Sequence, residues 1–151
     1  VLESPTGDKK SQQFEDDYLE ELFDEIKKIG FKAVTYVPPR NTAQQLKRVQ
    51  KLCKKYNLME ISGVDINQPR QSFNCPEILK PQFHHLIDMT WALIAHEKLA
   101  NYNSIYALFH KQNPLPNLSL RERVKVYSSI GRNIDPFNPE RVEHLIPIYF
   151  I

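Results

Sequence analysis

The sequence predicts an α/β protein in which a small parallel-sheet unit precedes a helical carboxy-terminal region. Two observations lead to this class. Helix and strand patterns alternate twice between residues 14 and 62, and the chain beyond residue 75 carries helical patterns punctuated by prolines. Helix, strand, helix and strand at these lengths are typical of parallel sheets, because a parallel pair needs a crossover helix between its strands.

The chain organisation follows from these patterns. We expect a flexible lead over residues 1–13, βα units over residues 14–75, and a helical region over residues 76–151 that packs on the same domain. No apolar run reaches the roughly 20 residues of a membrane span, and the start has no signal-peptide pattern. We therefore expect a cytoplasmic protein with no membrane partner. The two cysteines form no C-x-x-C pair and are predicted to be free thiols.

The first helix is predicted from Phe14 onward. Acidic residues lie toward its start and Lys27 and Lys28 at its end, an arrangement that suits the helix dipole, and Gly30 is the expected stop. The apolar positions of this helix recur at helical spacing: Phe14, Tyr18, Leu22, Ile26 and Ile29. A strand is predicted next, over residues 32–37, which are rich in β-branched and aromatic side chains and are followed by two prolines.

The second helix begins with a predicted capping box at Thr42 and Gln45. Its apolar face is expected to pack on the sheet, and its basic face is expected to meet water. The apolar face of this helix consists of Leu46, Val49, Leu52, Cys53 and Tyr56, and its basic face consists of Lys47, Arg48, Lys51, Lys54 and Lys55. A second strand is predicted over residues 58–62.

Helices account for the rest of the chain. A long, largely buried helix is predicted from Pro81 to about Asn101, with a short helix over residues 102–110. Ser119 and Glu122 form a second capping box, and Asn138 with Pro139 is expected to open a last helix that Pro147 ends. The broad apolar arc of the long helix consists of Phe83, Leu86, Ile87, Trp91, Leu93 and Ile94.

Two loops are candidates for chemistry, because ligands bind at the carboxyl ends of parallel strands. Arg40 lies between the first strand and a helix amino terminus, where it could clamp an anion; the alternative is a solvated loop arginine. Asp65 and Asn67 follow the second strand two residues apart and could point the same way. An isolated aspartate there would otherwise form a turn or cap a helix.

Other chemistries find little support. Four glycines and no G-x-G-x-x-G pattern argue against a nucleotide-binding loop, and a net charge of +2 gives no strong electrostatic case for nucleic acid. His96 and Glu97 begin an H-E-x-x-H motif, but Ala100 stands where the second histidine is needed. His84 and Asp88 could reach one cation or form a simple polar helix face.

Residues 22–37, the helix after them and residues 61–67 resemble the carboxy-terminal βαβ part of the polymerase-and-histidinol-phosphatase (PHP) domain family. Residues 69–73 and 90–97 also resemble segments of PHP-like metal-dependent hydrolases, and the similarity covers roughly residues 14–100. The resemblance implies a distorted β/α barrel of the TIM type that binds zinc, iron or manganese ions. In that family the metals activate water against a phosphate ester, which implies a phosphorylated small-molecule substrate.

The resemblance implies that Asp65 is a metal ligand, while Asn67 stands where the family motif has a histidine. The family's opening His-x-His motif has no counterpart, since no histidine precedes Asp65. We therefore expect a carboxy-terminal fragment that is inactive by itself, and whose exposed sheet edges favour self-association. The alternatives are a non-catalytic α/β interaction module, or a phosphate- or nucleic-acid-binding module that uses Arg40 and the basic helix face.

Overall fold

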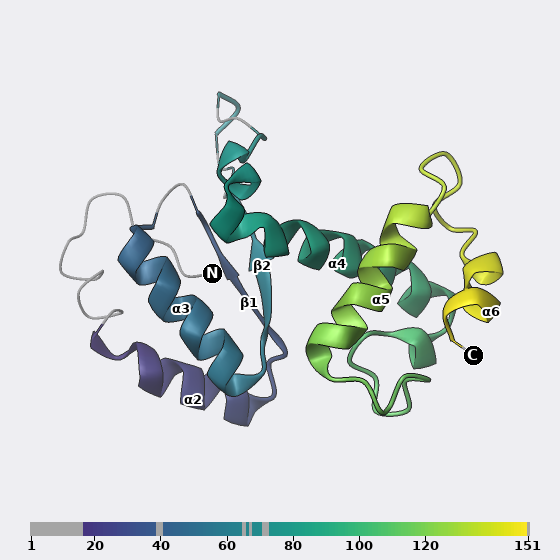
Figure 1. Ribbon diagram of the computed structural model, residues 1–151, viewed down its shortest axis with the longest axis horizontal. Coiled ribbons are helices and arrows are strands. Elements are labelled where there is room, and N and C mark those ends of the chain that lie inside the picture. The colour runs from purple at the N-terminus through teal and green to yellow at the C-terminus, as the bar shows by residue number, and fades with distance from the viewer. Residues whose placement is uncertain (1–16, 39–40, 65, 67, 71–72, 151) are drawn as a thin grey trace. The chain divides into compact units, whose positions relative to one another are not determined.

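The computed structural model describes residues 17–38, 41–64, 66, 68–70 and 73–150 (Figure 1). It confirms a mixed α/β protein with one parallel two-stranded sheet among these residues, followed by a largely helical region. The chain divides into two compact units, Val1–His84 and His85–Ile151. The expected lead over residues 1–13 lies outside the described part of the chain.

The amino-terminal unit begins with helix α2 (Leu19–Ile29). Its first turn carries Glu20 and Glu21 and its last turn Lys27 and Lys28, as the dipole argument predicts. Gly30 ends the helix in the left-handed conformation, at a φ of 101°, where a residue with a Cβ would be strained. Strand β1 (Ala33–Tyr36) follows within the predicted range.

Helix α3 (Ala43–Tyr56) connects β1 to strand β2 (Met59–Ser62). The predicted capping box is confirmed: the Thr42 side chain accepts a hydrogen bond from the Gln45 amide, and the Gln45 side chain accepts one from the Thr42 amide. The two strands pair in parallel, with Ala33 opposite Met59 and Tyr36 opposite Ser62. This is the crossover arrangement that the sequence predicts.

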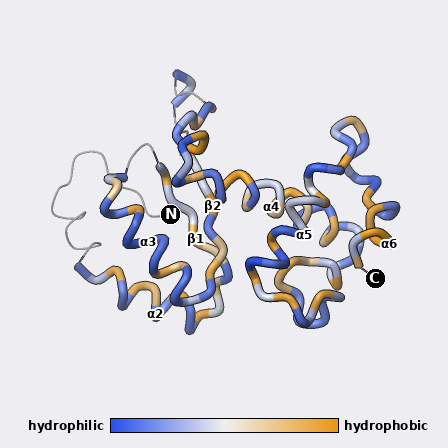
Figure 2. The backbone as a smooth tube through the Cα atoms, in the orientation of Figure 1, coloured by the Kyte–Doolittle hydropathy of each residue, from blue (hydrophilic) through white to orange (hydrophobic). Residues whose placement is uncertain are grey.

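The core of this unit joins both helices to the sheet. Figure 2 shows hydrophilic and hydrophobic residues alternating along α2 and α3, as amphipathic helices require. The rings of Phe23 on α2 and Tyr56 on α3 have centroids 6.0 Å apart, and Glu20 lies 3.6 Å from Lys55 at the rim of this contact. The buried hydrophobic side chains described in this unit are Leu19, Phe23, Val34, Tyr36, Val37, Leu46, Val49, Leu52, Cys53, Leu58, Met59 and Phe83.

Short 3-10 helices η1 (Pro76–Leu79) and η2 (Pro81–Phe83) lead into helix α4 (His84–Tyr102), which extends into the carboxy-terminal unit. The predicted short helix over residues 102–110 is a single 3-10 turn, η3 (Ser104–Tyr106). Helix α5 (Leu120–Asn133) begins at the predicted capping box of Ser119 and Glu122. Among the described residues, no helix is long and apolar enough to cross a membrane.

The last helix was predicted to begin at Asn138 and Pro139 and to end at Pro147, and this position is wrong. A 3-10 turn, η4 (Glu143–Leu145), precedes a single α-helical turn, α6 (Ile146–Tyr149). Pro139 opens no helix, because the chain after Asn138 forms a turn. Pro147 lies in the first turn of α6 instead of ending a helix. Proline is tolerated there since the amide of a first-turn residue has no partner within the helix.

The apolar arc predicted for α4 is also partly wrong. Ile94 is 37% exposed, and Trp91 is only partly buried. The buried positions of the helix are instead two leucines and two alanines: Leu86, Ala92, Ala95 and Leu99. Helices α4 and α5 approach closely at Gly131, where an added Cβ would lie 2.1 Å from the carbonyl oxygen of Trp91.

Candidate functional site

The candidate site lies at the edge of the sheet where both strands end, which we call the strand-end edge. β1 ends at Tyr36 and β2 at Ser62, and these two residues are register partners. The Gly63 amide donates a hydrogen bond to the Tyr36 carbonyl oxygen at 3.1 Å, so the parallel pairing continues one residue past the end of β2. The loops that follow the two strands therefore start side by side, as expected for a parallel pair.

Gly63 allows this close approach. A Cβ at this position would lie 3.3 Å from Cγ2 of Thr35 on the neighbouring strand, tighter than an ordinary van der Waals contact. The main chain after β2 can thus stay against β1 before the loop departs. A larger residue here would require Thr35 or the main chain at Gly63 to shift by a few tenths of an ångström.

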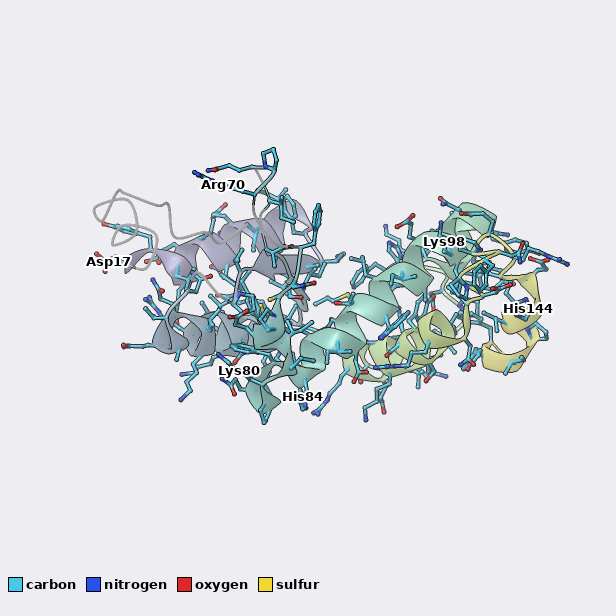
Figure 3. The ribbon with its side chains drawn as sticks, turned by 90° about the horizontal axis from the view of Figure 1, so that it is seen from above. Asp17, Arg70, Lys80, His84, Lys98 and His144 are labelled. Carbon is cyan, nitrogen blue, oxygen red and sulfur yellow. The ribbon has the colours of Figure 1, made fainter. Side chains whose placement is uncertain are left out.

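The three predicted site residues, Arg40, Asp65 and Asn67, lie outside the described residues, and their roles remain predictions. The structure does place the residues that lead to them. Pro38 is buried after β1, while Val64 is half-buried after β2. Further along, the Arg70 side chain (Figure 3) is exposed and donates to Gln68 at 2.9 Å.

The amino terminus of α3 adjoins the loop that follows β1. A hollow of about 290 Å³ lies there, lined by Thr42, Gln44, Gln45 and Arg48. The capping box satisfies the amides of Thr42 and Gln45, so fewer backbone donors remain for an anion than at an uncapped terminus. The side-chain oxygen of Asn41 is buried without a hydrogen-bond partner.

A polar cluster lies under the strand-end edge between the sheet and α3. The buried Tyr36 hydroxyl donates to Glu60 on β2 at 2.8 Å and accepts from the Gln50 amide group at 3.2 Å. Burial raises the pKa of Tyr36 well above its ordinary value, and the nearby Glu60 carboxylate adds to the effect. The tyrosine therefore stays neutral, and it joins both strands to the helix.

Cys53 lies close to the same cluster. Burial raises the pKa of its thiol to about 12, with a further contribution from the charge of Glu60. A thiolate nucleophile is therefore excluded at neutral pH. Both cysteines are free, as the sequence predicts.

His96 and His84 each form a hydrogen bond with the main chain. His96 is half-buried, and its Nδ1 accepts a hydrogen bond from the Leu108 amide at 3.0 Å. The Nε2 of His84, labelled in Figure 3, lies 2.7 Å from the Leu79 carbonyl oxygen. Within the described ranges, no three His, Cys, Asp or Glu side chains are grouped so that they could hold a metal ion.

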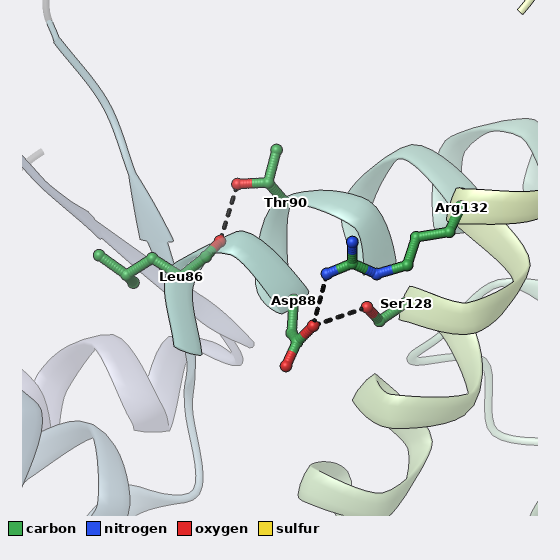
Figure 4. A network of polar contacts seen from close by, with 5 residues as sticks. All are labelled: Leu86, Asp88, Thr90, Ser128 and Arg132. Carbon is green, nitrogen blue, oxygen red and sulfur yellow. Dashed lines mark hydrogen bonds and ion pairs between the residues drawn. The ribbon is translucent and has the colours of Figure 1, made fainter. Parts of the chain in front are cut away.

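Asp88 belongs to a network in the carboxy-terminal unit, shown in Figure 4. Its Oδ1 accepts hydrogen bonds from Ser128 at 3.1 Å and from Arg132 at 2.9 Å. The Arg132 guanidinium also lies over the Trp91 ring, 5.6 Å from its centroid. Asp88 therefore joins α4 to α5. Of the two alternatives for His84 and Asp88, this structural role favours an ordinary polar helix face and not a shared cation site.

Sequence reasoning missed both polar groups, the Tyr36 cluster and the Asp88 network. Glu60 offered the clearest signal, because a charged residue between Met59 and Ile61 in a strand needs a partner when that face is covered. Asp88 offered none, since its partners lie 40 and 44 residues away along the chain.

We compared the chain with protein families, curated proteins and solved structures. No protein family, no curated protein and no solved structure was found to match the chain.

Proposed function

We propose that the chain is part of a PHP-like metal-dependent hydrolase that acts on phosphate esters at the strand-end edge. The observation that supports this most directly is the register of the sheet. Tyr36 lies opposite Ser62, and the segments toward Arg40 and Asp65 leave the sheet from paired positions. A phosphate clamp and a metal ligand placed on these two loops would share one edge of the sheet.

In this proposal β1 and β2 are neighbouring strands of a β/α barrel of the TIM type, joined by the crossover helix α3. Asp65 would hold a divalent metal ion, with Asn67 as a weak ligand or an orienting amide. A carboxylate and an amide oxygen are hard ligands, which suit manganese better than the softer metals. Such an ion supplies a hydroxide nucleophile and polarises the phosphoryl oxygens.

The role of this chain's own residues is positioning. Arg40 would bind the phosphoryl oxygens through its planar pair of N–H donors, a geometry that lysine cannot reproduce. Gly63 would keep the loop that bears Asp65 against β1, and the Tyr36 cluster would hold the two strand ends at a fixed distance. The site remains incomplete on this chain, so we expect little hydrolysis by the isolated protein.

The metal assignment can be tested with paramagnetic broadening. We expect substoichiometric Mn²⁺ added to the ¹⁵N-labelled chain to broaden the amide signals of Gly63, Val64 and Ile66 first, because these residues flank Asp65. Asp65→Ala should abolish the effect. Asp24→Ala, which removes an exposed carboxylate of α2, is the matched control and should leave it unchanged.

Selective broadening that persists in Asp65→Ala, or no selective broadening at any Mn²⁺ level, would contradict the metal assignment. The second candidate, a non-catalytic interaction module, would then be preferred. Its supporting observation is exposed apolar surface on α2 and just after it, where Leu22, Ile29 and Phe31 are 41%, 72% and 55% exposed. Steeply salt-dependent binding of an oligonucleotide would instead favour the phosphate- or nucleic-acid-binding module.

A further inference from the structure

Helices α2 and α3 carry opposite charge. α2 contains four carboxylates and two lysines, whereas α3 contains five cations and no acid. A solvated amphipathic helix usually mixes both signs on its outer face. The segregation here gives the amino-terminal unit one acidic and one basic helix side by side.

The contact between the two helices defines which of their surfaces stay uncovered. On α2, Glu20 faces Lys55 of α3, and Ile29 lies nine positions later, about 180° around the helix. On α3, Tyr56 contacts Phe23 of α2, and Lys47 lies nine positions earlier, again about 180° around. Each helix therefore has a flank that points away from the other.

The outward flank of α2, which we call the acidic flank, consists of Glu21, Leu22, Glu25 and Ile29. All four side chains are exposed, and Glu25 pairs with Lys28 of the same helix at 2.7 Å. The outward flank of α3, the basic flank, consists of Lys47, Lys51 and Lys54, which are also exposed. One flank combines apolar surface with carboxylates, and the other offers long lysine side chains.

We propose that the acidic flank of one molecule binds the basic flank of a second copy of the same chain, head to tail. The charges are complementary, and the methylene stems of the lysines can cover Leu22 and Ile29 while their ammonium groups reach Glu21 and Glu25. The two flanks lie on different helices of one unit, so the contact is heterologous and every molecule offers both halves of it.

The sheet supports the same geometry. Among the described residues it has two parallel strands, so β1 and β2 each have one edge that no described strand pairs with. When α3 of one molecule lies beside α2 of the next, β2 of the first can pair with β1 of the second and continue the parallel sheet. Backbone hydrogen bonds then add to the flank contact, which matters because exposed ion pairs alone contribute little.

Charge exchange between the flanks tests the proposal on the full chain. One variant carries Lys47→Glu and Lys54→Glu, and the other carries Glu21→Lys and Glu25→Lys. Each variant alone should associate at least ~10-fold more weakly than the natural chain, because like charges then face each other. An equimolar mixture of the two should associate again, since every mixed contact pairs opposite charges.

Sedimentation velocity over a range of concentrations and salt provides the measurement, and circular dichroism checks that the variants fold. The control carries Lys111→Glu and Arg121→Glu, two exposed cations outside the amino-terminal unit, and should associate like the natural chain. As a measurement that needs no variant, a carbodiimide should join α2 carboxylates to α3 lysines between ¹⁴N- and ¹⁵N-labelled molecules.

A chain that stays monomeric at all concentrations would overturn the proposal. So would association that the flank variants leave unchanged, a mixture that fails to associate, or intermolecular cross-links confined to other surfaces. Salt-sensitive binding of duplex DNA to the basic flank of a monomeric chain would assign that surface to nucleic acid instead. None of these outcomes depends on Asp65, so this inference and the metal assignment can fail separately.

Discussion

Asn113 ties together three parts of the carboxy-terminal unit, although its side chain is only 3% exposed. Its amide group donates to the Ala107 carbonyl oxygen at 3.0 Å and to the Tyr127 hydroxyl at 2.7 Å, and its oxygen accepts from the Leu115 amide at 2.9 Å. Tyr127 in turn donates to the Tyr106 carbonyl oxygen. The loop between η3 and α5 is therefore held by specific hydrogen bonds, not by apolar contact alone.

His96 holds the same loop from α4, through the bond from the Leu108 amide to Nδ1. The bond requires a neutral ring with Nδ1 unprotonated, so Nε2 carries the hydrogen. Burial lowers the pKa of His96 below its ordinary value of 6.5, and the charge of Glu97 opposes this only in part. Protonation would leave the Leu108 amide without its acceptor.

We expect His96 to make the protein less stable as the pH falls. The folded pKa lies below the unfolded one, so the unfolded chain binds the proton first, and the stabilisation is lost progressively as the pH falls below about 6.5. The loss should be of order 1 kcal/mol, the value of one hydrogen bond. Urea unfolding of the natural chain and of His96→Gln, between about pH 8 and about pH 5, measures it.

Glutamine keeps an acceptor but does not titrate, and the other four histidines are present in both proteins. The difference between the two stability curves therefore isolates His96. If the curves run parallel through the whole pH range, the assigned role of its Nδ1 is wrong.

At the scale of helices and strands, residue patterns that act locally were predicted well. Both capping boxes and the Gly30 stop were predicted, because each is decided by side chains within three or four residues of the helix end. The parallel pairing also follows from the order of elements. By contrast, the buried face of α4 was partly mispredicted, since hydrophobicity alone does not show which side of a helix its neighbours cover.

Gly131 provides the element-scale prediction. Alanine is normally the better helix former by about 1 kcal/mol, so Gly131→Ala in α5 would be stabilising if the helix were alone. Its Cβ would instead fall 2.1 Å from the Trp91 oxygen and 2.8 Å from the Trp91 carbonyl carbon, both main-chain atoms of α4. We expect a net loss of about 1–3 kcal/mol in thermal or urea unfolding, because the helices must move apart.

Ser129→Ala is the matched control, since Ser129 is an exposed residue of the same helix and its substitution should cost little. A Gly131→Ala protein as stable as the natural chain would mean that α4 and α5 can separate freely at this crossing.

On the scale of the whole molecule, the chain has two compact units, and its single tryptophan, Trp91, reports on the second. The core of the first unit contains the fully buried Phe23. We expect Phe23→Ala to destabilise the first unit by about 3–5 kcal/mol, because it leaves a cavity against Tyr56. The tryptophan fluorescence transition should shift much less than the far-ultraviolet circular dichroism transition, since separate units need not unfold together.

Coincident shifts of the two transitions would show that the units unfold as one. The control is Ile29→Ala, an exposed residue of the same helix, which should alter neither transition by more than about 0.5 kcal/mol at low protein concentration.

The sequence by itself determined the α/β class, the order of elements from α2 to β2, the Gly30 stop and the capping boxes of α3 and α5, the free thiols and the exposed basic face of α3. These depend on residues near one another in the chain, where spacing and propensity decide. Tertiary structure alone decided that Tyr36 bonds Glu60 and Gln50, that Asp88 bonds Arg132, and that α2 and α3 leave oppositely charged flanks uncovered. The reason is physical: these features depend on which surfaces meet across tens of residues, and hydrophobic periodicity specifies that a face is covered without specifying by what.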